Sequence, residues 1–164
     1  MRLALASDHA GFEALAQLQS YLESLDHQCY NYGPKSFRAD DDYPDFVGSA
    51  AAAVASGECQ AGVILGGSGQ GEAMAANRLA NVRCAVFYGT AVARRPIDAA
   101  GHTSRDPYEI LKLSRQHNDA NMLSLAARFL SLEEMKQAVK LWLETPFSNE
   151  PSHLRRIAKL GSPQ

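Results

Sequence analysis

The sequence is poor in the features that mark several common classes of protein. Its three cysteines, Cys29, Cys59 and Cys84, form no CxxC pair, which favours reduced, buried thiols over disulfides or a zinc site. Neither sign of charge dominates: 16 basic and 18 acidic residues leave a net charge of −2, so nothing suggests nucleic-acid or membrane partners. No apolar run is long enough to cross a bilayer, and the first one stops too early for a signal peptide. We therefore expect a soluble cytoplasmic protein.

What the chain does have is a regular alternation of strand and helix patterns. Its 164 residues, 46% of them hydrophobic, suffice for one domain with a sizeable core. The hydrophobic pattern predicts strands at 2–7, 28–32, 61–65, 82–88 and 122–130, and helices at 12–25, 46–55, 72–79, 110–114, 132–143 and 154–160. Residues 90–107 break any periodicity, so we expect a loop or broken helix there. This alternation is typical of a doubly wound parallel α/β sheet.

A glycine-rich loop follows the third expected strand. Residues 66–72 read GGSGQGE. Glycine loses more backbone freedom on folding than any other residue, so a cluster of four predicts a backbone that must closely approach a ligand. The amides of such a turn form a concave donor surface for an anion, with Glu72 placed at its rim. A simple strand-to-helix connection would need one glycine or two.

The spacing of this loop argues against two familiar nucleotide sites. A Walker A loop ends in Gly-Lys-Ser/Thr, whereas here Gly71 is followed by Glu72. The dinucleotide fingerprint would need its third glycine at position 72 rather than 71. A flavodoxin-like nucleotide-binding module is therefore a weak alternative.

Two further polar clusters are candidates for chemistry. Asp8 and His9 follow the first strand, at the sheet edge where ligands of doubly wound folds bind; the plain alternative is a helix cap beside a solvated histidine. Residues 115–121 read RQHNDAN just before the last strand, and they could simply end a helix. Yet a histidine at a strand entrance, near a carboxylate loop, also suits general acid-base catalysis at neutral pH.

Four motifs in the same order identify a resemblance to the ribose-5-phosphate isomerase B family, which includes the galactose-6-phosphate isomerase subunits. They are SDHAGF at 7–12, DYP at 42–44, GGSGQGE at 66–72 with AAN at 75–77, and SRQHNDAN at 114–121. The resemblance covers about residues 1–90 and 112–160. It implies a Rossmann-like three-layer α/β/α sandwich with a five-stranded parallel sheet, a dimer or tetramer with shared active sites, and proton transfer through a cis-enediolate without metal or cofactor.

The same resemblance implies a role for each motif residue. Glu72 resembles the base of the glutamate-using branch, whereas many members carry a catalytic cysteine at the position of Gly66. Ser68 and the amides of the loop would hold the enediolate oxygen, and His117 would open the sugar ring. The remaining substrate-binding residues would be Asp8, Tyr43 and Asn118 for hydroxyls, His9, Arg128 and Arg156 for phosphate, and Gly67, Gly69 and Gly71 for the oxyanion.

Two departures from the family touch the expected substrate site. The family usually has an arginine before the tail histidine, where this chain has Ser152, and extra sequence at 91–108 brings in Arg94, Arg95 and Arg105. The resemblance makes ribose 5-phosphate, a substrate of the pentose phosphate pathway, the default expectation. The two departures make another four- to six-carbon sugar, or an unphosphorylated one, the alternative. A non-catalytic phosphosugar-binding domain is a third reading, against which the presence of both Glu72 and His117 argues. The tail at about 146–164 is expected to pack on a neighbouring subunit.

Overall fold

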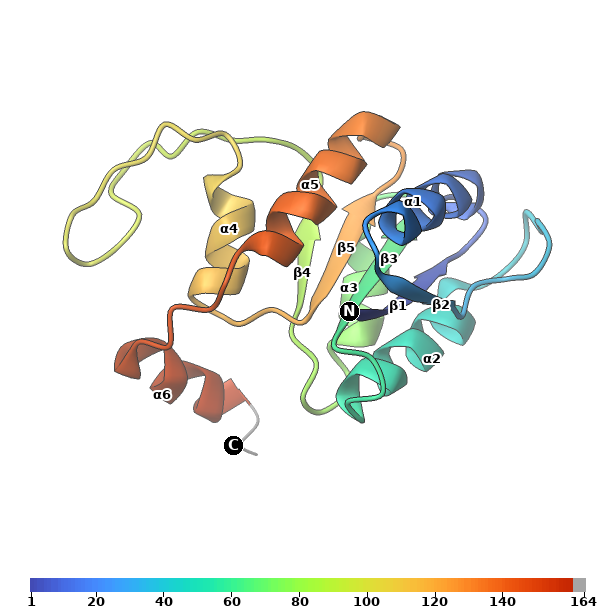
Figure 1. Ribbon diagram of the computed structural model, residues 1–164, viewed down its shortest axis with the longest axis horizontal. Helices are drawn as coiled ribbons and strands as arrows, with labels where there is room; N and C mark the ends of the chain where they lie inside the picture. The colour runs from blue at the N-terminus through green and yellow to red at the C-terminus, as the bar shows by residue number, and fades with distance from the viewer. Residues whose placement is uncertain (161–164) are drawn as a thin grey trace.

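A five-stranded parallel sheet forms the centre of the protein. The structure is a computed structural model, and it describes residues 1–160. The strands, in the order β2-β1-β3-β5-β4, are β1 (Arg2–Ser7), β2 (Gln28–Asn31), β3 (Ala61–Gly66), β4 (Cys84–Phe87) and β5 (Met122–Ala126). The helices are α1 (Phe12–Ser24), α2 (Tyr43–Ala55), α3 (Gln70–Ala76), α4 (Glu109–Gln116), α5 (Leu132–Glu144) and α6 (Pro151–Leu160) (Figure 1). The expected three-layer fold with a parallel sheet is confirmed.

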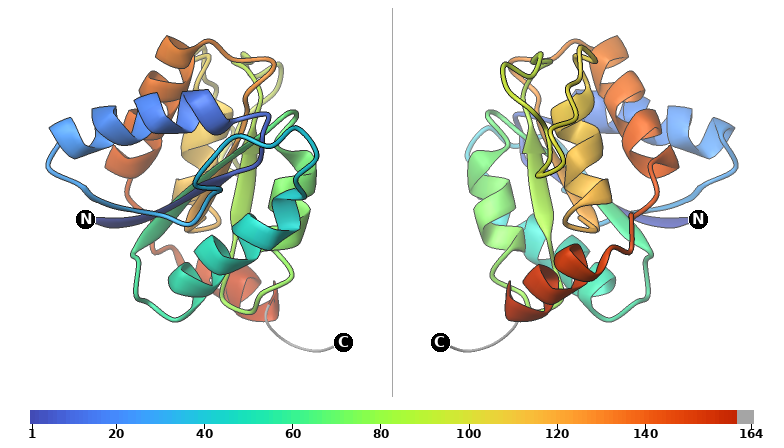
Figure 2. Two further views of the ribbon diagram at one scale, coloured as in Figure 1. Left: turned by 90° about the vertical axis from the view of Figure 1, so that its right-hand side faces the viewer. Right: turned by 90° about the vertical axis from the view of Figure 1, so that its left-hand side faces the viewer.

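Helices cover both faces of the sheet, as the alternation of side chains along β1 requires. Leu3 and Leu5 point into a core shared with α1, α4 and α5, whereas Ala4 and Ala6 point into a second core shared with α2. Figure 2 shows the sheet between these two layers. The small alanines on the second face let the alanine-rich α2 pack closely against the sheet. Among residues 1–160, no helix is long and apolar enough to span a membrane.

The strand order reverses between β1 and β3, and this reversal determines where a ligand can bind. The chain runs from β1 outward to β2, then returns to place β3 on the other side of β1. Ser7 at the end of β1 pairs with Leu65 near the end of β3. In doubly wound folds, ligands bind at the carboxyl edge of the sheet where the loops after two such strands diverge. Asp8-His9 and the glycine loop lie on this edge, as expected.

Some element boundaries differ from those expected. The last strand ends at Ala126 rather than residue 130, because the Ala127 amide leaves the ladder and donates to Gly66 O (2.8 Å). Helix α6 begins at Pro151, since proline suits a first turn that needs no amide donor. Residues 91–108 form an extended loop beside α4, within which the Ile97 amide donates to His102 O (2.7 Å) (Figure 1).

Candidate active site

The glycine loop is tied to the end of β5 at two points. Ser124 donates its buried hydroxyl to Gly69 O (2.6 Å), and the Arg128 amide donates to Gly67 O (3.2 Å). Gly69 has φ +72°, a left-handed conformation that L side chains rarely adopt, so glycine is required there. Within the described chain, no protein acceptor takes the amide protons of Gly67 or Gly69. These amides are therefore available to a ligand.

The carboxylate of Glu72 lies over Gly66, inside the loop. A Cβ atom at position 66 would overlap both carboxylate oxygens. Glu72 is 4% exposed, and burial, reinforced by the nearby negative charge of Asp8, raises the pKa of its carboxyl above the ordinary value. Its own backbone amide partly opposes that shift. A carboxylate with a raised pKa beside unpaired amide donors is the arrangement that a general base requires.

Tyr43 reaches the same loop from the start of α2. A Cβ atom at Gly71 would come within 2.8 Å of the Tyr43 ring and hydroxyl, so the absence of a side chain at 71 makes room for the phenol. Pro44 in the first turn of α2 helps to begin the helix here. The phenol thus borders the loop that carries Glu72, where a hydroxyl-binding group was expected. Ser68 lies in the same loop and is exposed.

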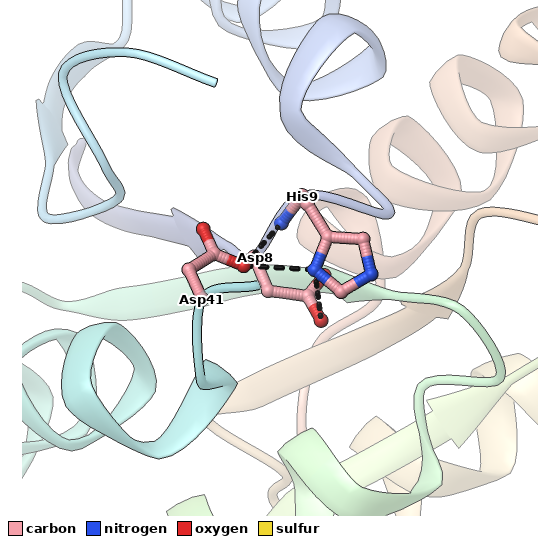
Figure 3. A group of neighbouring side chains, drawn as sticks. All are labelled: Asp8, His9 and Asp41. Atoms are coloured by element: carbon pink, nitrogen blue, oxygen red, sulfur yellow. Dashed lines mark hydrogen bonds and ion pairs between the residues drawn. The ribbon is translucent and has the colours of Figure 1, made fainter. Parts of the chain in front are cut away.

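His9 is held by two carboxylates (Figure 3). Its Nδ1 lies 2.8 Å from Asp41 Oδ1 and 3.7 Å from Asp8 Oδ2. The hydrogen bond to Asp41 is the main cause of a raised His9 pKa, which the positive charge of Arg128 opposes. Asp8 does not cap α1, whose N-cap residue is Gly11; instead Asp8 Oδ1 accepts the Ala10 amide at 2.9 Å.

Asp8, His9 and Asp41 also bring three possible metal ligands together. In the described chain they are the one group of this kind, with ligand atoms within 4.8 Å of one another. However, the distance between His9 Nδ1 and Asp41 Oδ1 is that of a hydrogen bond, and the same oxygen accepts the His9 amide at 3.0 Å. The arrangement fits a hydrogen-bonded group better than a metal centre.

A second group of candidate residues surrounds the end of α4. The rings of His117 and His153 contact each other with centroids 4.2 Å apart and planes tilted by 32°, and His153 Nδ1 lies 2.7 Å from Ser148 Oγ. The Ser148 amide donates to Gln116 O (3.1 Å), which ties the tail to α4. Burial, assisted by His153 and Arg156, lowers the pKa of His117. His117 is therefore largely neutral at pH 7, as a group that both accepts and donates protons should be.

The two groups lie at opposite edges of the sheet. His117 precedes β5 whereas Glu72 follows β3, and these strands pair in parallel with Gly62 opposite Met122 and Gly66 opposite Ala126. A strand of this length separates its two ends by roughly 15 Å. In Figure 1, α6 lies at the end of the sheet opposite the arrowheads of β4 and β5. The expectation that His117 lies near the carboxylate loop is therefore wrong within a single chain.

Each predicted site residue thus belongs to one of two half-sites. The carboxyl-edge half-site contains Asp8, His9, Tyr43, Gly67, Ser68, Gly69, Gly71, Glu72 and Arg128, and the amino-edge half-site contains His117, Asn118 and Arg156. Arg128 belongs to the first because its guanidinium would lie 3.3 Å from a Cβ atom at Gly67. Arg155 and Arg156 are both exposed on α6, and Arg156 is the one that affects the His117 pKa.

Sequence reasoning missed three residues that shape these half-sites. Arg83 donates from Nη2 to Asp119 Oδ2 (2.9 Å) and from Nε to Asn118 O (2.9 Å), and so holds the turn after His117. No local signal links it to residues 35 or 36 positions away. Asp41 could not be distinguished from the other polar residues around it. Ser124 could have been identified from the sequence, because it is the one hydroxyl residue in the apolar strand MLSLA.

Comparison with known proteins gives a consistent result. The model of a family described as Ribose/Galactose Isomerase matches residues 3–104 and 97–160. Ribose-5-phosphate isomerase B of Mycolicibacterium paratuberculosis is 36% identical over 157 residues, covering 96% of this chain and 87% of that protein. The Escherichia coli protein of the same name is 32% identical over 156 residues, covering 95% and 91%.

Solved structures agree. Ribose-5-phosphate isomerase B of Clostridium thermocellum has a TM-score of 0.83 at 30% identity, over 98% of this chain and 95% of that one. The Mycoplasma genitalium enzyme with bound ribulose-5-phosphate also has a TM-score of 0.83, at 29% identity, over 98% and 93%. The chain therefore belongs to the ribose/galactose isomerase family.

Proposed function

We propose that this protein interconverts ribose 5-phosphate and ribulose 5-phosphate. It is a sugar-phosphate isomerase by family, and relatives that align with nearly all of its length carry the name ribose-5-phosphate isomerase B. The observation that carries the proposal is the Glu72 carboxylate, buried over Gly66 beside unpaired loop amides. Moving a proton next to a carbonyl needs such a base and donors for the developing oxyanion.

In the proposed mechanism, Glu72 removes the proton from C2 of the open-chain aldose. The C1 carbonyl oxygen becomes an enediolate oxygen, which the amides of Gly67 and Gly69 and the hydroxyl of Ser68 stabilise. Glu72 then returns its proton to C1, while the proton of the C2 hydroxyl moves to O1. Two protons are removed, from C2 and O2, and two are added, to C1 and O1. The ketose then leaves, and the carboxylate of Glu72 is ionised again. The raised pKa of Glu72 brings it closer to the pH at which it must exchange protons.

A complete site requires two copies of the chain. The Glu72 half-site and the His117 half-site lie at opposite edges of one subunit, so a single subunit cannot offer both to one sugar. In a two-fold dimer, the His117 half-site of each subunit can face the Glu72 half-site of the other. We propose that the chain is one isomerase domain, that its tail from about residue 146 packs on the partner, and that the protein is at least a dimer. Residues 161–164 of the tail lie outside the described chain.

Within such a shared site, each remaining residue has a proposed role. His117 of the partner subunit would open the sugar ring, because a neutral imidazole can pass a proton between the ring oxygen and the anomeric hydroxyl. Asp8, Tyr43 and Asn118 would hold hydroxyls. His9 and Arg128, together with Arg156 of the partner subunit, would bind the phosphate, for which guanidinium groups have the right geometry.

Two observations favour testing other sugars. Ser152 replaces an arginine that the family resemblance leads us to expect, and the loop at 91–108 adds Arg94, Arg95 and Arg105. The charge of Asp98 in this loop acts on His117, whose pKa it raises slightly against the lowering effect of burial. A different phosphosugar with the same chemistry is therefore the second candidate.

For the first candidate, ribose 5-phosphate, we propose that the reaction belongs to pentose phosphate metabolism in the cytoplasm.

Turnover against a panel of aldose phosphates tests the proposal. The panel should hold four-, five- and six-carbon members and unphosphorylated ribose. We expect ribose 5-phosphate to have the highest kcat/KM. A higher value for a six-carbon phosphate would move the function to the second candidate, and turnover of none of them would overturn it.

A further inference from the structure

We propose that Asp41 is a positioning residue, which holds the imidazole of His9 so that its Nε2–H donates to the phosphate of the substrate. This inference rests on the proposed function, because it assigns the anion that His9 faces. Asp41 belongs to none of the motifs that identified the site. It lies in the polar stretch before α2, one residue ahead of Asp42, which is the N-cap of that helix.

The geometry of Asp41 ties both the backbone and the ring of His9 to one oxygen. Asp41 Oδ1 accepts the His9 amide at 3.0 Å and lies 2.8 Å from Nδ1. Two contacts from one carboxylate oxygen determine where the backbone of His9 sits and how its ring is turned. Because Nδ1 faces Asp41, it carries a proton, and Nε2 is the nitrogen left for a ligand (Figure 3).

The burial of Asp41 sets it apart from its neighbours. Its side chain is 6% exposed, whereas that of Asp40 is 78% exposed and pairs only with Arg38. Asp41 Oδ2 is also one of two buried side-chain polar atoms, in the described chain, that have no hydrogen-bond partner. Burying a carboxylate with one oxygen unpaired is costly, and natural proteins tolerate such groups where they have a function. Stability alone does not account for Asp41.

The charges around His9 determine what it can bind. Asp41 and Asp8 favour the imidazolium form, and Arg128 opposes it. The balance raises the pKa of His9, with the hydrogen bond to Asp41 as the largest cause. Imidazolium and Arg128, whose charge acts on His9, then offer two cationic donors at the same edge of the sheet, which suits a phosphate dianion better than a neutral hydroxyl. Without Asp41, the ring would lose both its orientation and much of its charge.

Substitution of Asp41 gives the test, with Asp40→Asn as the matched control. Asp41→Ala removes the acceptor and the charge, and should raise KM for ribose 5-phosphate about tenfold with kcat nearly unchanged. Asp41→Asn keeps an acceptor of the same shape, so KM should approach that of the wild type at low pH and rise earlier as the pH increases. In a His9→Gln background, Asp41→Asn should have no further effect on KM, because Asp41 acts through His9.

Nuclear magnetic resonance of the His9 ring provides a readout that needs no substrate. We expect a proton on Nδ1 and a pKa above 6.5 in the wild type, a lower pKa in Asp41→Asn, and no change in Asp40→Asn. A wild-type ring that titrates normally with its proton on Nε2 alone would overturn the inference, even if the variants misfold. So would variants whose KM matches that of Asp40→Asn. Absence of wild-type turnover would instead contradict the proposed function, and leave the ring measurement to decide the role of Asp41.

Discussion

The carboxylate of Glu72 fills the space over Gly66 that a side chain at position 66 would occupy. In the family that this chain resembles, many members place a catalytic cysteine at that position. Here the glycine admits a carboxylate from the start of α3 to the same place. The base that we propose therefore lies on the helix rather than at the strand end, in the same space above the loop. A side chain at position 66 and the carboxylate of Glu72 cannot both occupy this space.

Replacing the carboxylate tests its role as the base. Glu72→Gln is isosteric but cannot accept the C2 proton, so kcat should fall by roughly two to four orders of magnitude with little change in unfolding temperature. In the wild type, kcat/KM should rise with pH through the raised pKa of Glu72, because the base must be ionised. Steady-state kinetics across pH measure both effects. A Gln variant with near wild-type kcat would remove Glu72 from the mechanism.

Adding a methyl group beneath that carboxylate should also abolish most activity. In Gly66→Ala the new Cβ forces the flexible end of Glu72 to move, and a misplacement of about 1 Å can cost a hundredfold in rate. The fold should survive, since a side-chain tip rather than backbone must yield. Gly48→Ala in α2 is the matched control, because a Cβ there meets nothing within 4 Å. If both variants had the same kcat, the position of the carboxylate would not matter.

The role of His117 can be separated from enediolate formation by the choice of substrate. His117→Ala should slow ribose 5-phosphate, which is mostly ring-closed, far more than a four-carbon aldose phosphate that cannot close the same ring. The His117 pKa is lowered, so its neutral form, and with it the ring-opening step, should persist as the pH falls somewhat below 6.5. Parallel kinetics on the two substrates measure the difference. Equal losses on both would contradict a ring-opening role.

The proposed binding of phosphate by Arg156 predicts a difference between two adjacent arginines of α6. Arg156→Ala should raise KM for ribose 5-phosphate about tenfold or more, as expected for loss of a charged hydrogen-bond donor. Arg155→Ala should resemble the wild type, because the charge that acts on the pKa of His117 is that of Arg156 and the exposed Arg155 is not among its causes. Michaelis constants for the two variants decide the matter. Similar values for both would place the phosphate elsewhere.

Much of this structure could be predicted from the sequence, since local patterns determine it. The alternation of strand and helix patterns indicates a parallel sheet, and the glycines after β3 indicate an anion-binding loop, both from residues close together in the chain. The division into two half-sites follows from the same predictions, because in a parallel sheet a residue before a strand and a residue after a strand lie at opposite edges. The expectation that His117 lies near Glu72 considered their chemistry and overlooked this geometry. Asp41 and Arg83 could not be predicted from local patterns, because each contacts a residue more than 30 positions away.

The central claim is that each active site combines Glu72 of one subunit with His117 of another, and mixing two inactive variants tests it most directly. Glu72→Gln and His117→Ala protein are unfolded together, refolded, and assayed with ribose 5-phosphate. Half of randomly formed dimers are mixed and each holds one intact site, so about a quarter of wild-type activity should return. Each variant refolded alone supplies the baseline. Recovery to about a quarter of wild-type activity supports the shared site. A mixture no more active than the average of the two variants refolded alone would contradict it.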